Sequence, residues 1–301
     1  MNPRDREQAP PTYKLLGSAE RVDGVPVDQR AHDHLDPRKL SGSIDLSFTT
    51  IDPLHMGSGV SNFFAFGDRD MRLARDIVVQ WLGDMEAPVI PGASLKGAVR
   101  SIAEALGGGC DLSEPRCEPA CAVCAIFGHL MRDGGYLGRA GFDDAHPADP
   151  GQAADRMGAL LGPMPFQPRV SKGRRIYGVA PRPLDAPVPY VVVLREVSFK
   201  TRLHLTNITH AELGLVLLAC GADGSFRLRI GGGKFANMGR VRTEVAGATL
   251  RRSYLTPAPE LLDATAAGKL AEEAIEQATA KLSTRASAVL VTLRATLGDR
   301  P

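Results

Sequence analysis

Apolar and polar positions alternate in the segment that follows Leu40. Ile44, Leu46 and Phe48 are separated by single polar residues, which is typical of a strand with one buried face. The segment then runs into PLHMGSG, a glycine-containing loop. The folded part of the chain is therefore predicted to begin near residue 40 with a half-buried strand.

The segment VIPGASLKGAVR (residues 89–100) predicts the end of a buried strand, a Pro-Gly break, and a helix that starts near Leu95. Ser94 is placed to cap that helix. Free amides at the helix N-terminus, the Ser94 hydroxyl and the Lys96 ammonium would form a cradle for a phosphate group. Arg100 lies about one turn beyond Lys96 on the same face. A capped core helix with solvated basic residues is the alternative.

Strand and helix patterns alternate again in the second half of the chain. An apolar run that passes into alternating residues (188–208) predicts a central strand or a hairpin. Thr209 and Glu212 form a capping box before an apolar helix. Alanine-rich helical stretches follow residue 257. By contrast, residues 60–83 mix aromatic and charged residues without a clean period, which predicts a long irregular excursion on the surface.

Length and composition are those of a folded protein, and the sequence predicts a cytoplasmic one. The chain has 301 residues, 44% of them hydrophobic, which is enough for one large or two small domains. Its formal net charge is only +2, so nucleic-acid binding would depend on local basic clusters. No apolar run reaches membrane-spanning length, and the charged start is unlike a secretion signal. Residues 1–40 are polar and predict an extended arm, in which only Tyr13 to Leu16 is suited to docking.

Four of the five cysteines lie within fifteen residues, and the last two form a CxxC pair: Cys110, Cys117, Cys121 and Cys124. In a reducing compartment this spacing predicts four thiolates around one structural zinc ion (Zn²⁺) rather than disulfides. The zinc-binding loop would span about residues 107–130, with His129 as a spare ligand. Free thiols in a mobile loop are the alternative.

Basic residues gather in two glycine-containing segments. The loop RVSKGRRIYG combines cations with one aromatic residue, as suits single-stranded nucleic acid: Lys172, Arg174, Arg175 and Tyr177. A solvated charge run is the alternative there. The segment IGGGKFANMGR is not a nucleotide-hydrolase phosphate loop, because Phe235 follows Lys234 and the earlier glycine is missing. It still combines flexible backbone with positive charge at Gly231, Gly232, Gly233, Lys234 and Arg240.

Three motifs therefore stand in order: PLHMGSG, IPGASLKGAVR and IGGGKFANMGRVR. Together with CAIFG and the GRAGFDDA that follows it, they resemble the RAMP superfamily of CRISPR-associated proteins, in particular the backbone subunit of type III effector complexes. The resemblance covers roughly Ser41 to Glu244. It implies an α+β fold, a modified ferredoxin-like (RRM-like) βαββαβ core with insertions and extra C-terminal helices. The domains expected are an arm (1–40), a RAMP domain (41–256) and a C-terminal helical extension (257–301).

The resemblance also implies partners. Such subunits assemble along a CRISPR RNA (crRNA), beside other Cas subunits and copies of themselves, and expose the guide to target RNA in antiviral defence. No membrane partner is expected. The residues at the matching motif positions would contact the guide: His55, Gly57, Ser58, Ser94, Lys96, Arg100, Gly231, Gly232, Gly233 and Lys234.

Several relatives also cut target RNA, using an aspartate before the IPG turn and a divalent ion such as Mg²⁺. By this resemblance Asp76 is the catalytic carboxylate, and Asp68, Asp70 and Asp84 are its alternates. Ile77-Val78 replaces the family's Asn-Pro at this point, so the resemblance implies RNA binding more directly than endonuclease activity. Two alternatives stay open: a non-catalytic capping subunit, and a guide-processing ribonuclease that works with a histidine.

Overall fold

The structure is a computed structural model that describes residues 13–16, 32–65, 70–110, 117, 120–131, 134–163, 174–177, 187–251, 253 and 258–298. Its strands are β1 (Tyr13–Leu16), β2 (Leu40–Thr50), β3 (Gly57–Ala65), β4 (Met71–Ile77), β5 (Val79–Leu82), β6 (Met85–Pro88), β7 (Gly128–Met131), β8 (Gly134–Leu137), β9 (Ala140–Phe142), β10 (His146–Pro147), β11 (Met157–Pro163), β12 (Arg174–Tyr177), β13 (Pro187–Val193), β14 (Ser198–Ile208), β15 (Leu228–Arg229), β16 (Arg240–Leu250) and β17 (Glu260–Leu262). Its helices are α1 (Gly92–Leu106), α2 (Ala122–Phe127), α3 (Pro150–Asp155), α4 (His210–Ala219), α5 (Ala264–Ala280), α6 (Thr284–Leu297) and the 3₁₀ helix η2 (Lys234–Ala236).

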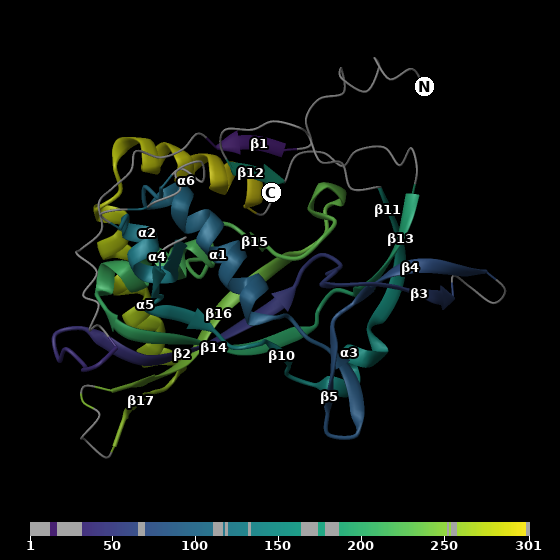
Figure 1. The fold of residues 1–301 in the computed structure, drawn as a ribbon, viewed down its shortest axis with the longest axis horizontal. Coiled ribbons are helices and arrows are strands. Elements are labelled where there is room, and N and C mark those ends of the chain that lie inside the picture. Colours follow the sequence, from purple (N-terminus) through teal and green to yellow (C-terminus); the bar gives the residue numbers. More distant parts are fainter. Residues whose placement is uncertain are drawn as a thin grey trace.

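The largest sheet has seven strands, and its main path runs β10-β14-β2-β16-β15 (Figure 1). Strand β9 pairs with β14 on the same edge as β10, and β17 pairs with β16. Along the chain, β2-α1-β9 is followed by β14-α4-β16, and the four strands stand in the order β16-β2-β14-β9. This is the split βαβ arrangement of ferredoxin-like folds. The predicted α+β ferredoxin-like core is confirmed.

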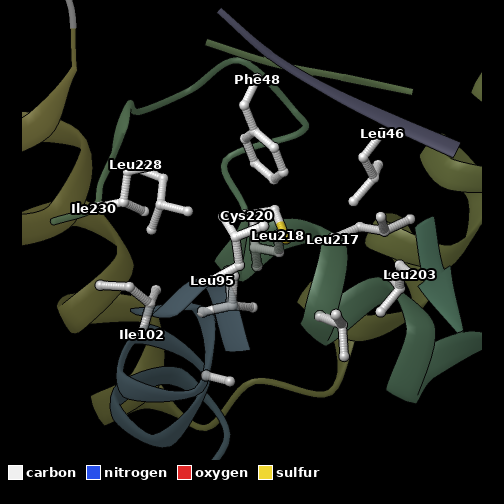
Figure 2. Close-up of a cluster of buried hydrophobic side chains, with 14 of the residues drawn as sticks. Leu46, Phe48, Leu95, Ile102, Leu203, Leu217, Leu218, Cys220, Leu228 and Ile230 are labelled. Atoms are coloured by element: carbon white, nitrogen blue, oxygen red, sulfur yellow. The ribbon is translucent and has the colours of Figure 1, made fainter. Parts of the chain in front are cut away.

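Helices α1 and α4 cover one face of this sheet and enclose the main core. Figure 2 shows Leu46 and Phe48 of β2 directed toward Leu95 of α1 and toward α4. Phe48 is fully buried because the alternation of β2 turns every second side chain to this face. The capping box of α4 forms as predicted, with the Thr209 side chain accepting from the Glu212 amide at 3.2 Å.

The C-terminal helices extend the core at two places: α5 packs against α4, and α6 packs against α1 and β12. A stripe of alanines on α5 is buried against α4: Ala267, Ala271, Ala274 and Ala278. A Cβ on Gly214 of α4 would collide with the Ala274 carbonyl, so glycine is required for this close helix contact. Among the helices of the described residues, none is both long enough and apolar enough to cross a bilayer.

A second sheet, in the order β11-β13-β4-β3, is built from two insertions, one between β2 and α1 and the other between β9 and β14. Strands β3 and β4 form an antiparallel hairpin in which Phe63 lies opposite Leu73. The prediction of an irregular excursion at residues 60–83 was therefore wrong. The period was hidden because both faces of the hairpin are largely exposed, Phe63 at 70% and Leu73 at 56%, so no buried face imposes an apolar alternation.

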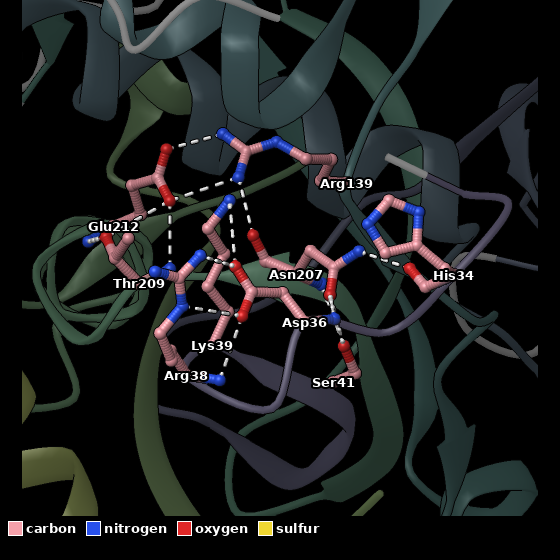
Figure 3. Close-up of polar contacts among 9 residues, drawn as sticks. All are labelled: His34, Asp36, Arg38, Lys39, Ser41, Arg139, Asn207, Thr209 and Glu212. Atoms are coloured by element: carbon pink, nitrogen blue, oxygen red, sulfur yellow. Dashed lines mark hydrogen bonds and ion pairs between the residues drawn. The ribbon is translucent and has the colours of Figure 1, made fainter. Parts of the chain in front are cut away.

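Contacts of the N-terminal arm begin before residue 40. In Figure 3, Asn207 accepts a hydrogen bond from the Asp36 amide at 2.7 Å and donates to the His34 carbonyl at 2.7 Å. Arg139, which pairs with Glu212, donates to the Asn207 carbonyl at 2.8 Å. Farther back, β1 pairs with β12 in an antiparallel ladder, as the docking prediction for this segment anticipated.

Candidate nucleic-acid interface

The three sequence motifs meet around one cavity of about 520 Å³. Each motif contributes lining residues, although they lie far apart in the chain, and β12 and the end of α6 complete the wall. The lining consists of Met56, Gly57, Val78, Pro91, Ser94, Gly97, Ala98, Ser101, Ile102, Arg175, Ile176, Tyr177, Arg229, Gly231, Gly232, Lys234 and Leu297. No aspartate or glutamate is among these described lining residues.

The glycines of the GGGK segment are required by close packing on His55. Gly231 has a positive φ of 74°, and a Cβ there would collide with the His55 carbonyl oxygen. The Gly232 amide donates to that same oxygen at 2.8 Å, while a Cβ on Gly232 would lie only 2.8 Å from His55 Cδ2. The absence of side chains at these glycines therefore lets the loop pack directly on His55. The same two glycines also line the cavity.

His55 is itself a buried joint between the two sheets. Its Nδ1 donates to the Val191 carbonyl of β13 at 2.8 Å, and its ring meets Tyr190 edge-on with centroids 4.9 Å apart. Burial lowers the pKa of this histidine, which favours the neutral ring. Of the three guide contacts predicted in this motif, His55, Gly57 and Ser58, only Gly57 lines the cavity. Ser58 is exposed on β3, where its hydroxyl accepts a hydrogen bond from the Val60 amide.

Positive charge in the cavity comes from Arg175, Arg229 and Lys234. Arg229 is 8% exposed, and its Nη1 donates to the Met238 carbonyl at 2.9 Å. Its buried Nε has no hydrogen-bond partner among the residues that the structure describes. Burial lowers the pKa of Arg229 to about 10, and burial followed by the Arg229 charge also lowers the pKa of Lys234. Desolvation disfavours the charged form of both groups, and for Arg229 the nearby Asp52 charge offsets this only in part.

The carboxylate of Asp52 lies beside Arg229 but is hydrogen-bonded to Arg240. Two hydrogen bonds of 2.6 and 3.0 Å join the Arg240 guanidinium to Asp52, whereas Arg229 Nη1 lies 3.9 Å from it. Arg240, predicted as an RNA contact, is therefore engaged in a bidentate pair and does not line the cavity. One carboxylate therefore faces two guanidinium groups, closely at Arg240 and at longer range at Arg229, and a positive excess remains.

The helix terminus at the IPG turn differs from the prediction. Helix α1 begins at Gly92, and Ser94 lies inside its first turn without capping it. The Gly92 amide donates to Asp144 Oδ1 at 2.7 Å, and the Ser94 and Leu95 amides donate to the Pro91 carbonyl. The predicted cradle of free amides was wrong, because a carboxylate from the turn after β9 already occupies that position. Ser94 reaches the cavity by its exposed side chain.

Lys96 and Arg100 project from a different face of α1 and do not line the cavity. The Arg100 guanidinium donates to Glu104 at 2.9 Å, to the Gly128 carbonyl at 2.9 Å and to Cys124 Sγ at 3.3 Å. Lys96 is half-buried beside it, and burial followed by the Arg100 charge lowers the pKa of Lys96. Their contact with guide phosphates stays a prediction.

The cysteine cluster is preformed against this second face of α1. The Sγ atoms of Cys110, Cys117, Cys121 and Cys124 lie within 4.8 Å of one another, and all four residues are buried. A tetrahedral zinc site with Zn–S bonds of about 2.3 Å needs sulfurs roughly 3.8 Å apart, and Cys110 Sγ lies 3.6 Å from Cys124 Sγ. Backbone amides of Cys110 and Cys124 donate to Cys121 Sγ, each at 3.3 Å. Such a set could hold a metal ion such as zinc; His129 Nδ1 stands beside it, 3.8 Å from Cys124 Sγ.

The predicted catalytic aspartates are dispersed. Asp76 on β4 accepts from the Asn62 side chain at 2.7 Å and from the Ile77 amide at 2.8 Å. Asp70 is paired with Arg72, Asp84 lies in the turn between β5 and β6, and Asp68 falls outside the described residues. Within the described ranges, the cysteine cluster is the only group of three or more potential ligands close enough to share a metal. A catalytic Mg²⁺ at Asp76 stays a prediction.

The basic loop enters the site through β12. Arg175 and Tyr177 line the cavity, while Lys172 and the side chain of Arg174 fall outside what the structure describes. Sequence reasoning missed Arg229. The available signal was its position two residues before Gly231, at the end of a strand that delivers the glycine loop.

A comparison with protein families gives one match. The model of the RAMP superfamily matches residues 47–243, a range that contains all three motifs, the cavity's glycine loop and the cysteine cluster. No curated protein matches the chain. The family match supports a CRISPR-associated, RNA-binding role in general.

Proposed function

The chain belongs to the RAMP superfamily, and from that premise we propose that it is a crRNA-binding subunit of a type III CRISPR effector ribonucleoprotein. One observation carries the finer proposal. The three motif segments enclose a cavity with cations from Arg175, Arg229 and Lys234 and with no carboxylate among its described lining residues. The guide backbone is the anion that this cavity takes.

The energetics favour a phosphate at this position. Burial, followed by the neighbouring Arg229 charge, lowers the pKa of Lys234, and burial likewise lowers the pKa of Arg229. A phosphate oxygen would restore hydrogen bonds to both groups and offset their mutual repulsion. Each such contact also releases a counterion from the RNA, so binding would weaken as salt concentration rises.

The test is guide binding by the Lys234→Met variant, which keeps the aliphatic stem of the side chain and removes the charge. We expect roughly tenfold weaker binding and a decrease of about 0.7 in the slope of log affinity against log salt, the value of one contact to a single strand. The matched control is Arg242→Gln, since Arg242 is exposed and pairs with Glu244. Equal losses in the two variants would reject the cavity as the guide site.

Cleavage of target RNA by Asp76 is a second part of the proposal. Asp76 precedes Val78, a lining residue of the cavity, by two positions, so a bound strand would pass close to it. Asp76 would hold Mg²⁺ or another divalent ion, which supplies Lewis-acid stabilisation of the reacting phosphate. With magnesium and the reconstituted complex, we expect Asp76→Asn to abolish cutting and Asp84→Asn to retain it. If the parent complex binds target RNA without cutting it, the cleavage role of Asp76 is rejected and the chain is an RNA-binding scaffold.

The proposed partners are crRNA, target RNA, other Cas subunits and further copies of this chain along the guide. A capping subunit would occur once per complex and a backbone subunit several times, so mass measurement of the assembled complex separates these alternatives. A guide-processing ribonuclease would cut repeat RNA in EDTA. The buried, neutral His55 already bonded to Val191 is a structural joint rather than an evident base for that reaction.

The cysteine cluster is proposed to hold structural zinc. Cys110, Cys117, Cys121 and Cys124 would be its ligands, and the ion would cross-link the loop after α1 to the start of α2. Arg100 donates to the Cys124 sulfur and to the Gly128 carbonyl, which ties the cluster to α1. The metal site would in this way support the helix whose other face lines the cavity.

A further inference from the structure

We propose that the cavity receives one whole nucleotide of the bound RNA, with its phosphate at Arg229 and Lys234 and its base against Tyr177. This inference rests on the proposed function and specifies which part of the RNA enters. A volume of about 520 Å³ greatly exceeds the needs of a single phosphate and falls in the range of pockets for small organic ligands.

The anion end is defined by Arg229. It is a buried guanidinium whose Nε lacks a partner among the described residues, although its Nη1 is held by the Met238 carbonyl. Buried polar groups are almost always hydrogen-bonded. An unpartnered donor in a cavity wall therefore indicates a position where a bound ligand would accept the hydrogen bond. Lys234 lies close enough to Arg229 for their charges to interact, and both line the cavity. Two donors of this kind suit the oxygens of one phosphate.

The remaining wall suits a nucleoside. Tyr177 offers an aromatic ring of the kind on which single-stranded bases stack. Small residues of α1, Gly97 and Ala98, leave room for a flat ring, and the hydroxyls of Ser94 and Ser101 can bond to a ribose or a base edge. Apolar contacts come from Met56, Val78, Ile102, Ile176 and Leu297. A mixture of cations, hydroxyls, one tyrosine and apolar side chains is the chemistry of a nucleotide, not of an inorganic anion alone.

The open face of the large sheet supports the cavity as the place for a base. In many RNA-binding proteins of this topology, aromatic residues on the exposed sheet face stack on the bases. Here the exposed positions of β14 are Lys200, Arg202 and His204. Arg202 pairs with Asp45, and His204 bonds to Asp143 at 2.8 Å. Among these three positions the ring is the imidazole of His204, which is held by Asp143, whereas the cavity has the larger ring of Tyr177.

The experiment is photochemical cross-linking of the full chain to a guide RNA that carries 4-thiouridine at one position at a time. We expect one position per bound chain to cross-link to cavity residues of β12 or α1, as identified by mass spectrometry of the conjugate. Arg229→Gln should weaken guide binding roughly tenfold and remove that cross-link, and Arg229→Lys should partly restore it. Arg242→Gln is the charge control and should retain both.

The outcomes separate this inference from the proposed function. Guide binding of normal affinity with every cross-link outside the cavity would overturn the nucleotide site and leave the guide-binding role standing. Absence of guide binding by the parent chain would overturn both. Thermal unfolding of the Arg229 variants is measured alongside, and a loss of cross-linking only in proportion to unfolded protein would also count against the site.

Discussion

The two faces of helix α1 serve different sites, although their residues alternate within one short motif. The face of Ser94, Gly97, Ala98 and Ser101 lines the cavity, and the face of Lys96, Arg100 and Glu104 lies toward the cysteine cluster. At 100° per residue the two sets are centred about 110° apart, so they lie on adjacent faces of the helix. The face that lines the cavity is thus the one built from small and hydroxyl-bearing residues.

The charges on the two sides are balanced differently. Arg100 is matched by Glu104, a carbonyl and a cysteine sulfur, so its positive charge is used within the protein. Arg229 is matched less completely: its Nη1 bonds to the Met238 carbonyl and lies 3.9 Å from Asp52, and its Nε has no partner among the described residues. Under the proposed function, we therefore expect RNA contacts from those basic residues of the motifs whose charge is least matched within the protein. We expect substitution of Arg100 to lower the stability of the protein, and substitution of Arg229 or Lys234 to lower its affinity for RNA.

The largest expected effect is on the unfolding free energy, and it follows from removing two ligands of the cysteine cluster. Protein purified without chelator should contain about one zinc ion per chain, and the Cys121→Ser, Cys124→Ser double variant none. Unfolding free energy should fall by about 3–5 kcal/mol, because four buried polar groups lose their shared ligand. Cys220→Ala is the control, since Cys220 is buried at the end of α4 away from the cluster and should leave the zinc content unchanged. A parent chain without zinc would make the cluster a set of loop thiols.

A smaller effect separates the two faces directly. Arg100→Met should lower the unfolding free energy by about 2–3 kcal/mol, because it removes the cation beside the buried Glu104 carboxylate. Guide affinity, measured under conditions where the variant is folded, should change less than twofold. Adding Glu104→Gln should recover part of the stability. If Arg100→Met instead lost guide affinity and kept its stability, the division between the two faces would be wrong.

Much of the fold follows from sequence patterns. The alternation of Ile44, Leu46 and Phe48 and the capping box at Thr209 are local signals that the tertiary structure obeys. The cysteine spacing likewise brings four sulfurs together because the ligands lie close in the chain. The hairpin of β3 and β4 could not be read in this way, since exposed strands carry no buried period and depend on pairing with each other.

The site was less accessible to sequence reasoning because its decisive features are contacts between distant residues. Arg229 is a candidate phosphate contact because it is buried beside Lys234, and this proximity cannot be deduced from the number of basic residues in the sequence. Arg240 has the same charge but is neutralised by Asp52, 188 positions away in the chain. The sequence therefore identified the motif segments that come together in the fold. Which of their charged side chains are paired with one another could be seen only in the structure.

The smallest expected effect concerns the start of α1, where a carboxylate replaces the phosphate that the sequence suggested. Asp144 Oδ1 accepts from the Gly92 amide and its Oδ2 from the Gln80 side chain at 3.0 Å. Asp144→Ala should therefore lower the unfolding free energy by about 1 kcal/mol, as for loss of a helix cap, and leave guide affinity unchanged. The exposed neighbour supplies the control, Asp143→Ala. If removing Asp144 tightened guide binding, the freed amides would be taking a phosphate, and the cavity would share that role with the helix terminus.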